Sequence, residues 1–173
     1  MNYESTAVAL SEAISDDVES FIRSIADELL GYFARRVVPH EDAADCLSET
    51  FLVLWRRSER LPMEQGDRRA WSYGIAHRVL AAHRRHGLRQ LSLATRLREE
   101  LRDRPLASES GDDEAVTALA SLSARDRELV TLVVWEELTI AQAATALGIK
   151  AEAARARYSR ARRSLRLRLG APV

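Results

Sequence analysis

Cysteine is nearly absent from the sequence, and Cys46 is its only representative. A single thiol excludes an internal disulfide framework and fits a reducing compartment. Long apolar runs are missing as well, since no stretch approaches the roughly 20 residues that a membrane-spanning helix needs. The N-terminal residues also lack the basic and apolar segments of a signal peptide. We therefore expect a cytoplasmic protein with no membrane insertion of its own.

The usual signs of catalysis are missing too. We find no glycine-rich phosphate loop, no pairing of a nucleophile with a base and no metal-binding cluster. His77, His83 and His86 are close in sequence, but their spacing does not place all three on one helical face, and no cysteine or carboxylate lies beside them. We expect no enzymatic activity, no cofactor and no bound metal.

Strand-like alternation is also scarce, whereas helical periodicity recurs along the chain. Hydrophobic residues make up 46% of the sequence, which is enough for one or two small cores. The prediction is an all-α fold with two small helical domains joined by a flexible linker. The expected parts are a disordered N-terminus (1–17), a first domain (18–88), a linker (89–113) and a helix-turn-helix domain (114–170).

Charge is distributed unevenly, although the net charge is zero. Residues 1–67 carry a net charge of −8, residues 68–104 of +7, residues 105–137 of −6 and residues 138–173 of +7. Basic segments suit phosphates, and acidic segments suit a protein partner or maintain solubility.

The last basic segment has the pattern of a helix-turn-helix. Its first helix carries an apolar stripe, Gly148 ends that helix, and an arginine-rich helix begins near Ala151. The stripe comprises Ile140, Ala143, Ala144 and Leu147. A buried helical hairpin is the alternative, but buried helices do not carry seven arginines. We therefore expect the second helix to enter a DNA major groove.

The first domain should contain three helices, near 18–36, 41–57 and 68–87. In the second, one face is predicted to be buried and the other acidic. The predicted buried face comprises Ala44, Leu47, Phe51, Leu54 and, as a further candidate, Trp55. In the third, basic residues alternate with aromatic ones, a composition that suits single-stranded nucleic acid. Trp71 is expected in the core, whereas Tyr73 fits the core and base stacking equally well.

The second domain should contain a helix capped by Ser123 ahead of the helix-turn-helix. Its inward-facing residues are predicted to be Leu129, Leu132, Val133 and Trp135.

These segments together resemble the extracytoplasmic-function (ECF) sigma factors of bacterial RNA polymerase. EDAADCLSETFLVLW and RRAWSYGIAHRVLAAHRR are similar to region 2 of that family. LASLSARDRELVTLVV and the helix-turn-helix ending in RARYSRARRSLR are similar to region 4. The resemblance extends over residues 18–169.

The resemblance implies three groups of site residues. The surface for core RNA polymerase would comprise Asp42, Asp45, Glu49, Phe51 and Trp55. Contacts to the −10 element would come from Arg68, Arg69, Tyr73, His77, Arg78, Arg84 and Arg85. Contacts to the −35 element would come from Lys150, Arg155, Ala156, Arg157, Ser159 and Arg160, of which Arg157 and Arg160 would hold phosphates.

The resulting hypothesis is a noncatalytic subunit that binds core RNA polymerase and promoter DNA, opens the duplex and is controlled by an anti-sigma factor. The alternative is a helix-turn-helix transcriptional regulator that does not engage the polymerase. Such a regulator would have no need of the segment 41–85.

Overall fold

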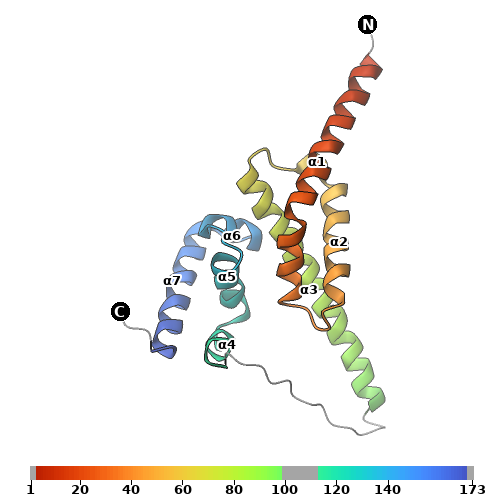
Figure 1. Ribbon diagram of the computed structural model, residues 1–173. Coiled ribbons are helices and arrows are strands. Elements are labelled where there is room, and N and C mark those ends of the chain that lie inside the picture. The colour runs from red at the N-terminus through yellow and green to blue at the C-terminus, as the bar shows by residue number, and fades with distance from the viewer. Residues whose placement is uncertain (1–2, 99–112, 171–173) are drawn as a thin grey trace. The chain divides into compact units, whose positions relative to one another are not determined.

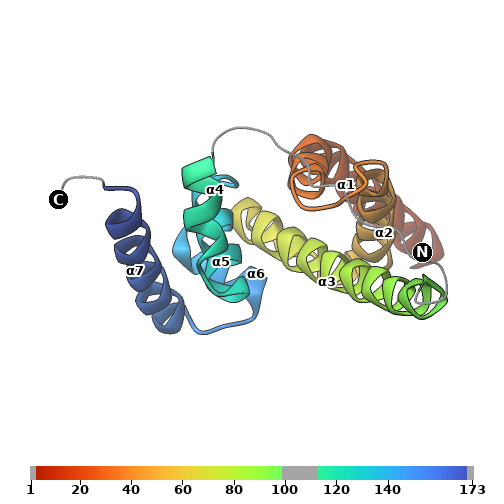
Figure 2. The same ribbon diagram turned by 90° about the horizontal axis from the view of Figure 1, so that it is seen from below.

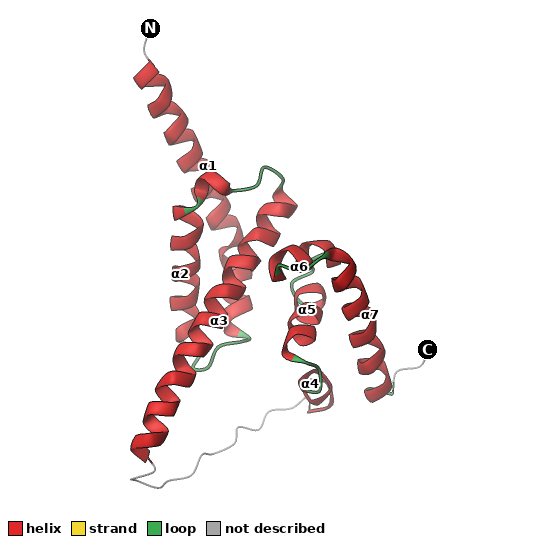
Figure 3. Cartoon of the chain, turned by 180° about the vertical axis from the view of Figure 1, so that it is seen from behind, coloured by secondary structure: helices red, strands yellow, loops and turns green. Residues whose placement is uncertain are grey.

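The computed structural model describes residues 3–98 and 113–170, without the side chains of 3–15, 88–98, 113, 114 and 116. These residues form helices and no strands, which confirms the predicted all-α fold (Figures 1 and 3). The elements are α1 (Tyr3–Ala34), α2 (Asp42–Arg56), the 3₁₀ turn η1 (Ser58–Arg60), α3 (Gln65–Arg98), α4 (Asp113–Ala120), α5 (Ala124–Val134), α6 (Ile140–Leu147) and α7 (Ala151–Arg168). The chain divides into two compact units, residues 1–81 and 82–173.

Helix α1 begins well before the position predicted from the sequence. It starts at Tyr3, so the prediction of a disordered segment 1–17 was wrong. The segment STAVALSEAIS contains neither glycine nor proline and includes three alanines, the residue with the highest helix propensity. Its polar composition therefore does not prevent helix formation.

The core of the N-terminal unit lies among its three long helices. Helix α2 returns alongside α1, and α3 runs past both (Figures 1 and 2). Leu29, Tyr32 and Phe33 of α1 are fully buried, as are Tyr73 and Ile75 of α3. The rings of Tyr32 and Tyr73 meet edge to face with centroids 5.5 Å apart, a favoured aromatic geometry.

The buried face of helix α2 overlaps only in part with the predicted one. Its buried residues are Ala43, Cys46, Thr50 and Leu54, whereas Ala44 and Trp55 are exposed. The predicted Leu54 is buried and the predicted Leu47 and Phe51 are half-buried, but the prediction did not include the polar Thr50. The Thr50 hydroxyl donates to the Cys46 carbonyl oxygen at 2.8 Å, so its burial leaves no unsatisfied donor.

Helix α3 is longer and more deeply buried than expected. It continues to Arg98, so the prediction that a linker begins at 89 was wrong in this part of the chain. The segment LRQLSLATRLR contains no helix breaker. Ile75 and Val79 are buried, and so are the neighbouring Ser72 and Ala76, so the burial between residues 70 and 80 is not confined to one helical face.

Helix α5 organises the C-terminal unit. Its N-cap is Ser123, whose hydroxyl oxygen accepts from the Asp126 backbone N–H at 3.1 Å, as predicted. Leu129 and Leu132 are fully buried, as expected, but Trp135 is 54% exposed and that prediction was wrong. The helix ends at Val134, and the backbone then turns through Glu137, whose φ is 52°. The helical periodicity therefore does not extend to Trp135.

Candidate nucleic-acid and protein interfaces

The outer face of α2 combines acidic and apolar side chains. Asp45, Glu49, Leu52 and Trp55 are all exposed, and Leu52 and Trp55 are 55% and 47% exposed. They lie at spacings of four, three and three residues, so they share one helical face. We name this set the α2 face. Exposed leucine and tryptophan flanked by carboxylates suit a partner with both apolar and basic groups.

The α2 face includes only part of the group predicted to contact polymerase. Asp45, Glu49 and Trp55 belong to it, whereas Asp42 and Phe51 lie half-buried at its edges. Leu52 was included neither in the predicted buried face nor in the group predicted to contact polymerase. Its position seven residues after Asp45 and three after Glu49 was the available signal.

The arginines at the head of α3 are engaged within the protein. The Arg68 guanidinium donates to both carboxylate oxygens of Asp17, at 3.0 and 2.8 Å, and its Nε donates to the Pro62 carbonyl oxygen at 2.6 Å. Arg69 Nε donates to Glu28 Oε2 at 2.7 Å. Both acids belong to α1, so these arginines join α3 to α1. Their predicted contact with the −10 element would compete with these ion pairs.

The ion pair with Arg68 also changes the ionisation of the Asp17 carboxyl. The hydrogen bonds from Arg68 hold the pKa of the Asp17 carboxyl below its usual value, because they favour the charged form. The Arg68 side chain is only 16% exposed, and its guanidinium lies 5.8 Å from the centre of the Phe21 ring. The pair is therefore better ordered than a typical surface ion pair.

Tyr73 belongs to the core, one of the two placements that the sequence left open, so its ring is not exposed for stacking on a base. Its side chain is fully buried, and its ring packs against Tyr32. The Arg69 guanidinium covers the ring at 5.5 Å from its centre.

The remaining residues predicted to contact the −10 element lie further along α3. Arg78, Arg84 and Arg85 are exposed, and His77 is half-buried. The sequence thus overestimated the cationic surface at the head of α3 and located its exposed charge correctly in the helix's next turns.

The helix-turn-helix has the predicted local structure. Thr139 caps α6 in a capping box with Gln142, and Gly148 ends α6 with a φ of 65°, a left-handed conformation that glycine adopts without steric cost. Ala143 and Ala144 of α6 and Ala154 of α7 are buried where the two helices contact each other. Small side chains allow this close approach and fix the orientation of α7.

Helix α7 presents its polar residues to solvent. Among the residues predicted to contact the −35 element, Arg157 is half-buried and the others are exposed: Lys150, Arg155, Ala156, Ser159 and Arg160. Ala154 and Ala161 form its buried side. Unlike the head of α3, this helix carries its arginines on a face that its own unit leaves open.

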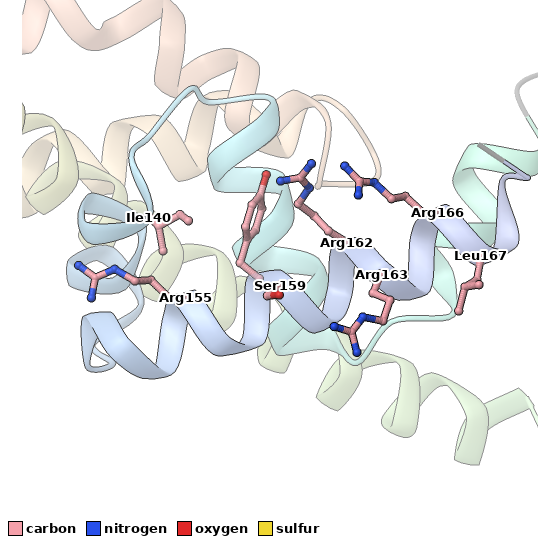
Figure 4. Close-up of a pocket in the computed structure, with 8 residues that line it drawn as sticks. Ile140, Arg155, Ser159, Arg162, Arg163, Arg166 and Leu167 are labelled. Carbon is pink, nitrogen blue, oxygen red and sulfur yellow. The ribbon is translucent and has the colours of Figure 1, made fainter. Parts of the chain in front are cut away.

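A shallow groove of about 500 Å³ runs along the exposed side of α7. Four arginines line it, together with Ile140 of α6 and the α7 residues Tyr158, Ser159 and Leu167 (Figure 4). Those arginines are Arg155, Arg162, Arg163 and Arg166. We name this set the α7 arginine groove. The last three were counted in the sequence only as net charge, although their spacing of seven to eleven residues from Arg155 places them on the same face.

A second, apolar groove of about 240 Å³ lies among α4, α5 and α7. Its lining includes Val134 and Trp135, which are 55% and 54% exposed, and Leu165 and Leu169. Trp135, which was predicted to lie in the core, therefore contributes to a surface. Exposed apolar surface of this kind is typical of a protein contact.

Neither a metal site nor a membrane-spanning helix is found in the parts of the chain that the structure describes. No group of three or more metal-ligating side chains assembles among those residues. None of their helices combines the length and apolar composition needed to cross a bilayer.

Two family models match the chain in sequence. The model for sigma-70 region 2 matches residues 21–89, and the model for sigma-70 region 4 matches residues 112–165. The matches appear in the predicted order and include α2, the head of α3 and the helix-turn-helix. The comparison with curated proteins finds no match.

Two solved structures share the fold. The sigma factor RpoE from Bartonella quintana, in complex with the anti-sigma factor NepR, is 20% identical with a TM-score of 0.62; the alignment covers 91% of this chain and 99% of that one. CnrH, in complex with the cytosolic domain of CnrY, is 23% identical with a TM-score of 0.60. That alignment covers 94% of this chain and 96% of the other.

Proposed function

The chain belongs to the sigma-70 family, and from that membership we propose that it acts as an ECF-type sigma factor. It binds core RNA polymerase, recognises the −35 and −10 promoter elements and promotes DNA melting. The polymerase then performs the chemistry, so the chain itself is not an enzyme.

The proposal rests on one observation. A surface that suits a protein partner and a surface that suits DNA lie in different regions, each matched by its own family model. The α2 face, in region 2, offers carboxylates and apolar side chains. The α7 arginine groove, in region 4, lies on the second helix of a helix-turn-helix. A regulator that binds only DNA would need the second surface but not the first.

Within this proposal the DNA contacts divide between the two regions. Arg155, Ala156 and Ser159 read the −35 bases, and Arg157, Arg160 and Lys150 lie near its phosphates. Arg78, Arg84 and Arg85 supply exposed charge for the −10 region, with His77 beside them. The tight intramolecular pairs of Arg68 and Arg69 assign those two residues a structural role.

An anti-sigma partner is the second part of the proposal. The similar structure of RpoE is a complex of a sigma factor with an anti-sigma factor, and the similar structure of CnrH is a complex with the cytosolic domain of CnrY. The α2 face and the apolar groove beside Trp135 offer exposed apolar area for a protein of this kind.

The test is in vitro transcription with core enzyme, combined with core binding by variants of the α2 face. Asp45→Arg with Glu49→Arg reverses the charge of two exposed residues and should abolish both activities. Asp27→Arg, on the exposed side of α1, is the matched control and should retain both. Retained core binding by the double variant would favour the helix-turn-helix regulator instead.

A further inference from the structure

The α2 face and the α7 arginine groove carry opposite charges in a similar arrangement. On α2, the exposed carboxylates of Asp45 and Glu49 are four residues apart, and Leu52 follows one turn later. On α7, Arg162 and Arg166 are also four residues apart, and their guanidinium groups lie on the same side of the helix (Figure 4). Each surface therefore has two like charges separated by one helical turn, beside apolar side chains.

These charges are available to a partner. Within the part of the chain that the structure describes, no ion pair involves Asp45 or Glu49. The four arginines of the α7 arginine groove are exposed. The apolar component is exposed as well, since Leu52 on α2 is 55% exposed and Leu167 on α7 is 80% exposed. Both surfaces therefore remain open after each unit has packed its own core.

An antiparallel contact between the two helices matches their charges along their length. It brings the acidic first turns of α2 to the arginine-rich end of α7, so that the two carboxylates of the α2 face lie opposite Arg166 and Arg162 in turn. At the other end it brings the exposed Arg56 of α2 towards the exposed Glu152 of α7. Antiparallel helices also align their dipoles favourably. A parallel contact would instead bring the basic ends of both helices together.

We propose that the α2 face of one copy of this chain binds the α7 arginine groove of a second copy. A two-fold axis repeats the contact with the roles exchanged, so a closed dimer contains it twice. The chain as a whole has no net charge, so a second copy approaches without overall repulsion. Because exposed ion pairs contribute little individually, the dimer should be weak, form at micromolar concentrations and dissociate when salt screens the charges.

The consequence of this contact rests on the proposed function. The dimer covers the surface assigned to core polymerase and the arginines assigned to promoter DNA. Two free chains therefore hold each other away from both partners, and either partner must displace the second copy before it can bind. Self-association thus keeps unengaged chains off nonspecific DNA, to which exposed arginines otherwise bind.

Sedimentation equilibrium of the full chain, over about a hundredfold range of micromolar concentrations, tests the contact. The unmodified chain should shift from monomer to dimer, and raising the salt concentration about tenfold should return it to monomer. The α2 double variant, Asp45→Arg with Glu49→Arg, should remain monomeric. The α7 double variant, Arg162→Glu with Arg166→Glu, should do the same, because each reversal sets like charges against one another. Asp27→Arg, an exposed reversal outside both surfaces, should dimerise as the unmodified chain does.

A mixture of the two double variants gives the decisive measurement. In a mixed dimer the reversed α2 of one chain meets the reversed α7 of the other, and the two remaining surfaces keep their natural charges, so both contacts are attractive again. Equimolar mixing should therefore restore dimers that neither variant forms alone, a result that a misfolded variant cannot give.

A mixture that stays monomeric would overturn the inference, and so would an unmodified chain that is monomeric at every concentration. Neither result touches the proposed function. If the unmodified chain dimerises but starts no transcription with core polymerase, the proposed function fails and the dimer stands.

Discussion

The head of α3 and the exposed side of α7 are both rich in arginine, yet their arginines have different surroundings. Arg68 and Arg69 pair with Asp17 and Glu28, and their side chains are 16% and 27% exposed. The arginines of the α7 groove are exposed to solvent. The difference arises because α3 lies against an acidic helix, whereas α7 contacts its unit through small apolar residues. Arginine content alone therefore does not distinguish a binding surface from a structural ion pair.

Of the predictions that follow from this comparison, the largest effect is expected from substituting Tyr73, which lies in the core beneath Arg69. Tyr73→Ala should lower the free energy of unfolding of the N-terminal unit by about 3–5 kcal/mol, because it removes a buried aromatic side chain. Denaturation followed by tryptophan fluorescence would measure this. Tyr73→Phe keeps the ring and should cost less than about 1.5 kcal/mol, with promoter opening preserved. If either variant lost promoter opening without losing stability, Tyr73 would have to contact DNA.

Arg155 provides the corresponding test on α7. Arg155→Ala should weaken binding of a −35 duplex by about 1–3 kcal/mol while leaving the melting temperature unchanged, since the side chain is exposed. Fluorescence anisotropy at fixed salt would measure the affinity. Arg69→Ala is the contrasting variant: it should reduce stability and leave this affinity unaltered. Equal effects of the two variants on DNA binding would remove the distinction between the two helices.

The distal arginines of the α7 groove should contribute mainly through phosphates. Replacing Arg162, Arg163 and Arg166 by alanine should make the slope of log affinity against log salt shallower by about 2–3, near one unit per lost phosphate contact. Base discrimination should be maintained. A salt titration on matched and mismatched −35 duplexes checks both points; an unchanged slope would place these residues outside the DNA contact.

Lowering the pH should reduce the stability that the Asp17–Arg68 ion pair contributes at the head of α3, and should leave the arginines of α7 charged. Because Arg68 lowers the pKa of Asp17 below its usual 3.8, this pair stabilises the fold above about pH 4, and the stabilisation is lost as pH falls through the lowered pKa. The stability difference between the unmodified chain and Asp17→Asn should be about 1 kcal/mol or less at pH 6 and should shrink towards pH 3. A difference independent of pH would show that the charge on Asp17 is not its cause.

Local sequence signals were reliable where neighbouring residues along the chain decide the structure. The all-α fold, the Ser123 cap, the Gly148 turn and the buried Ala143 and Ala144 follow from caps, periodicity and the steric freedom of glycine. The ends of α1 and α3 were misjudged because polar and charged composition was taken as a sign of disorder. Nothing in those segments breaks a helix.

The sequence by itself determined the helical order, the two matched regions and the exposed arginine face of α7, because each depends on spacing within one helix. Only the tertiary structure decided which arginines are engaged internally, that Tyr73 is buried and that Trp135 faces solvent. The partners of Arg68 and Arg69 lie 51 and 41 residues away, on α1. No periodicity within α3 can reveal a carboxylate brought to it by the packing of another helix.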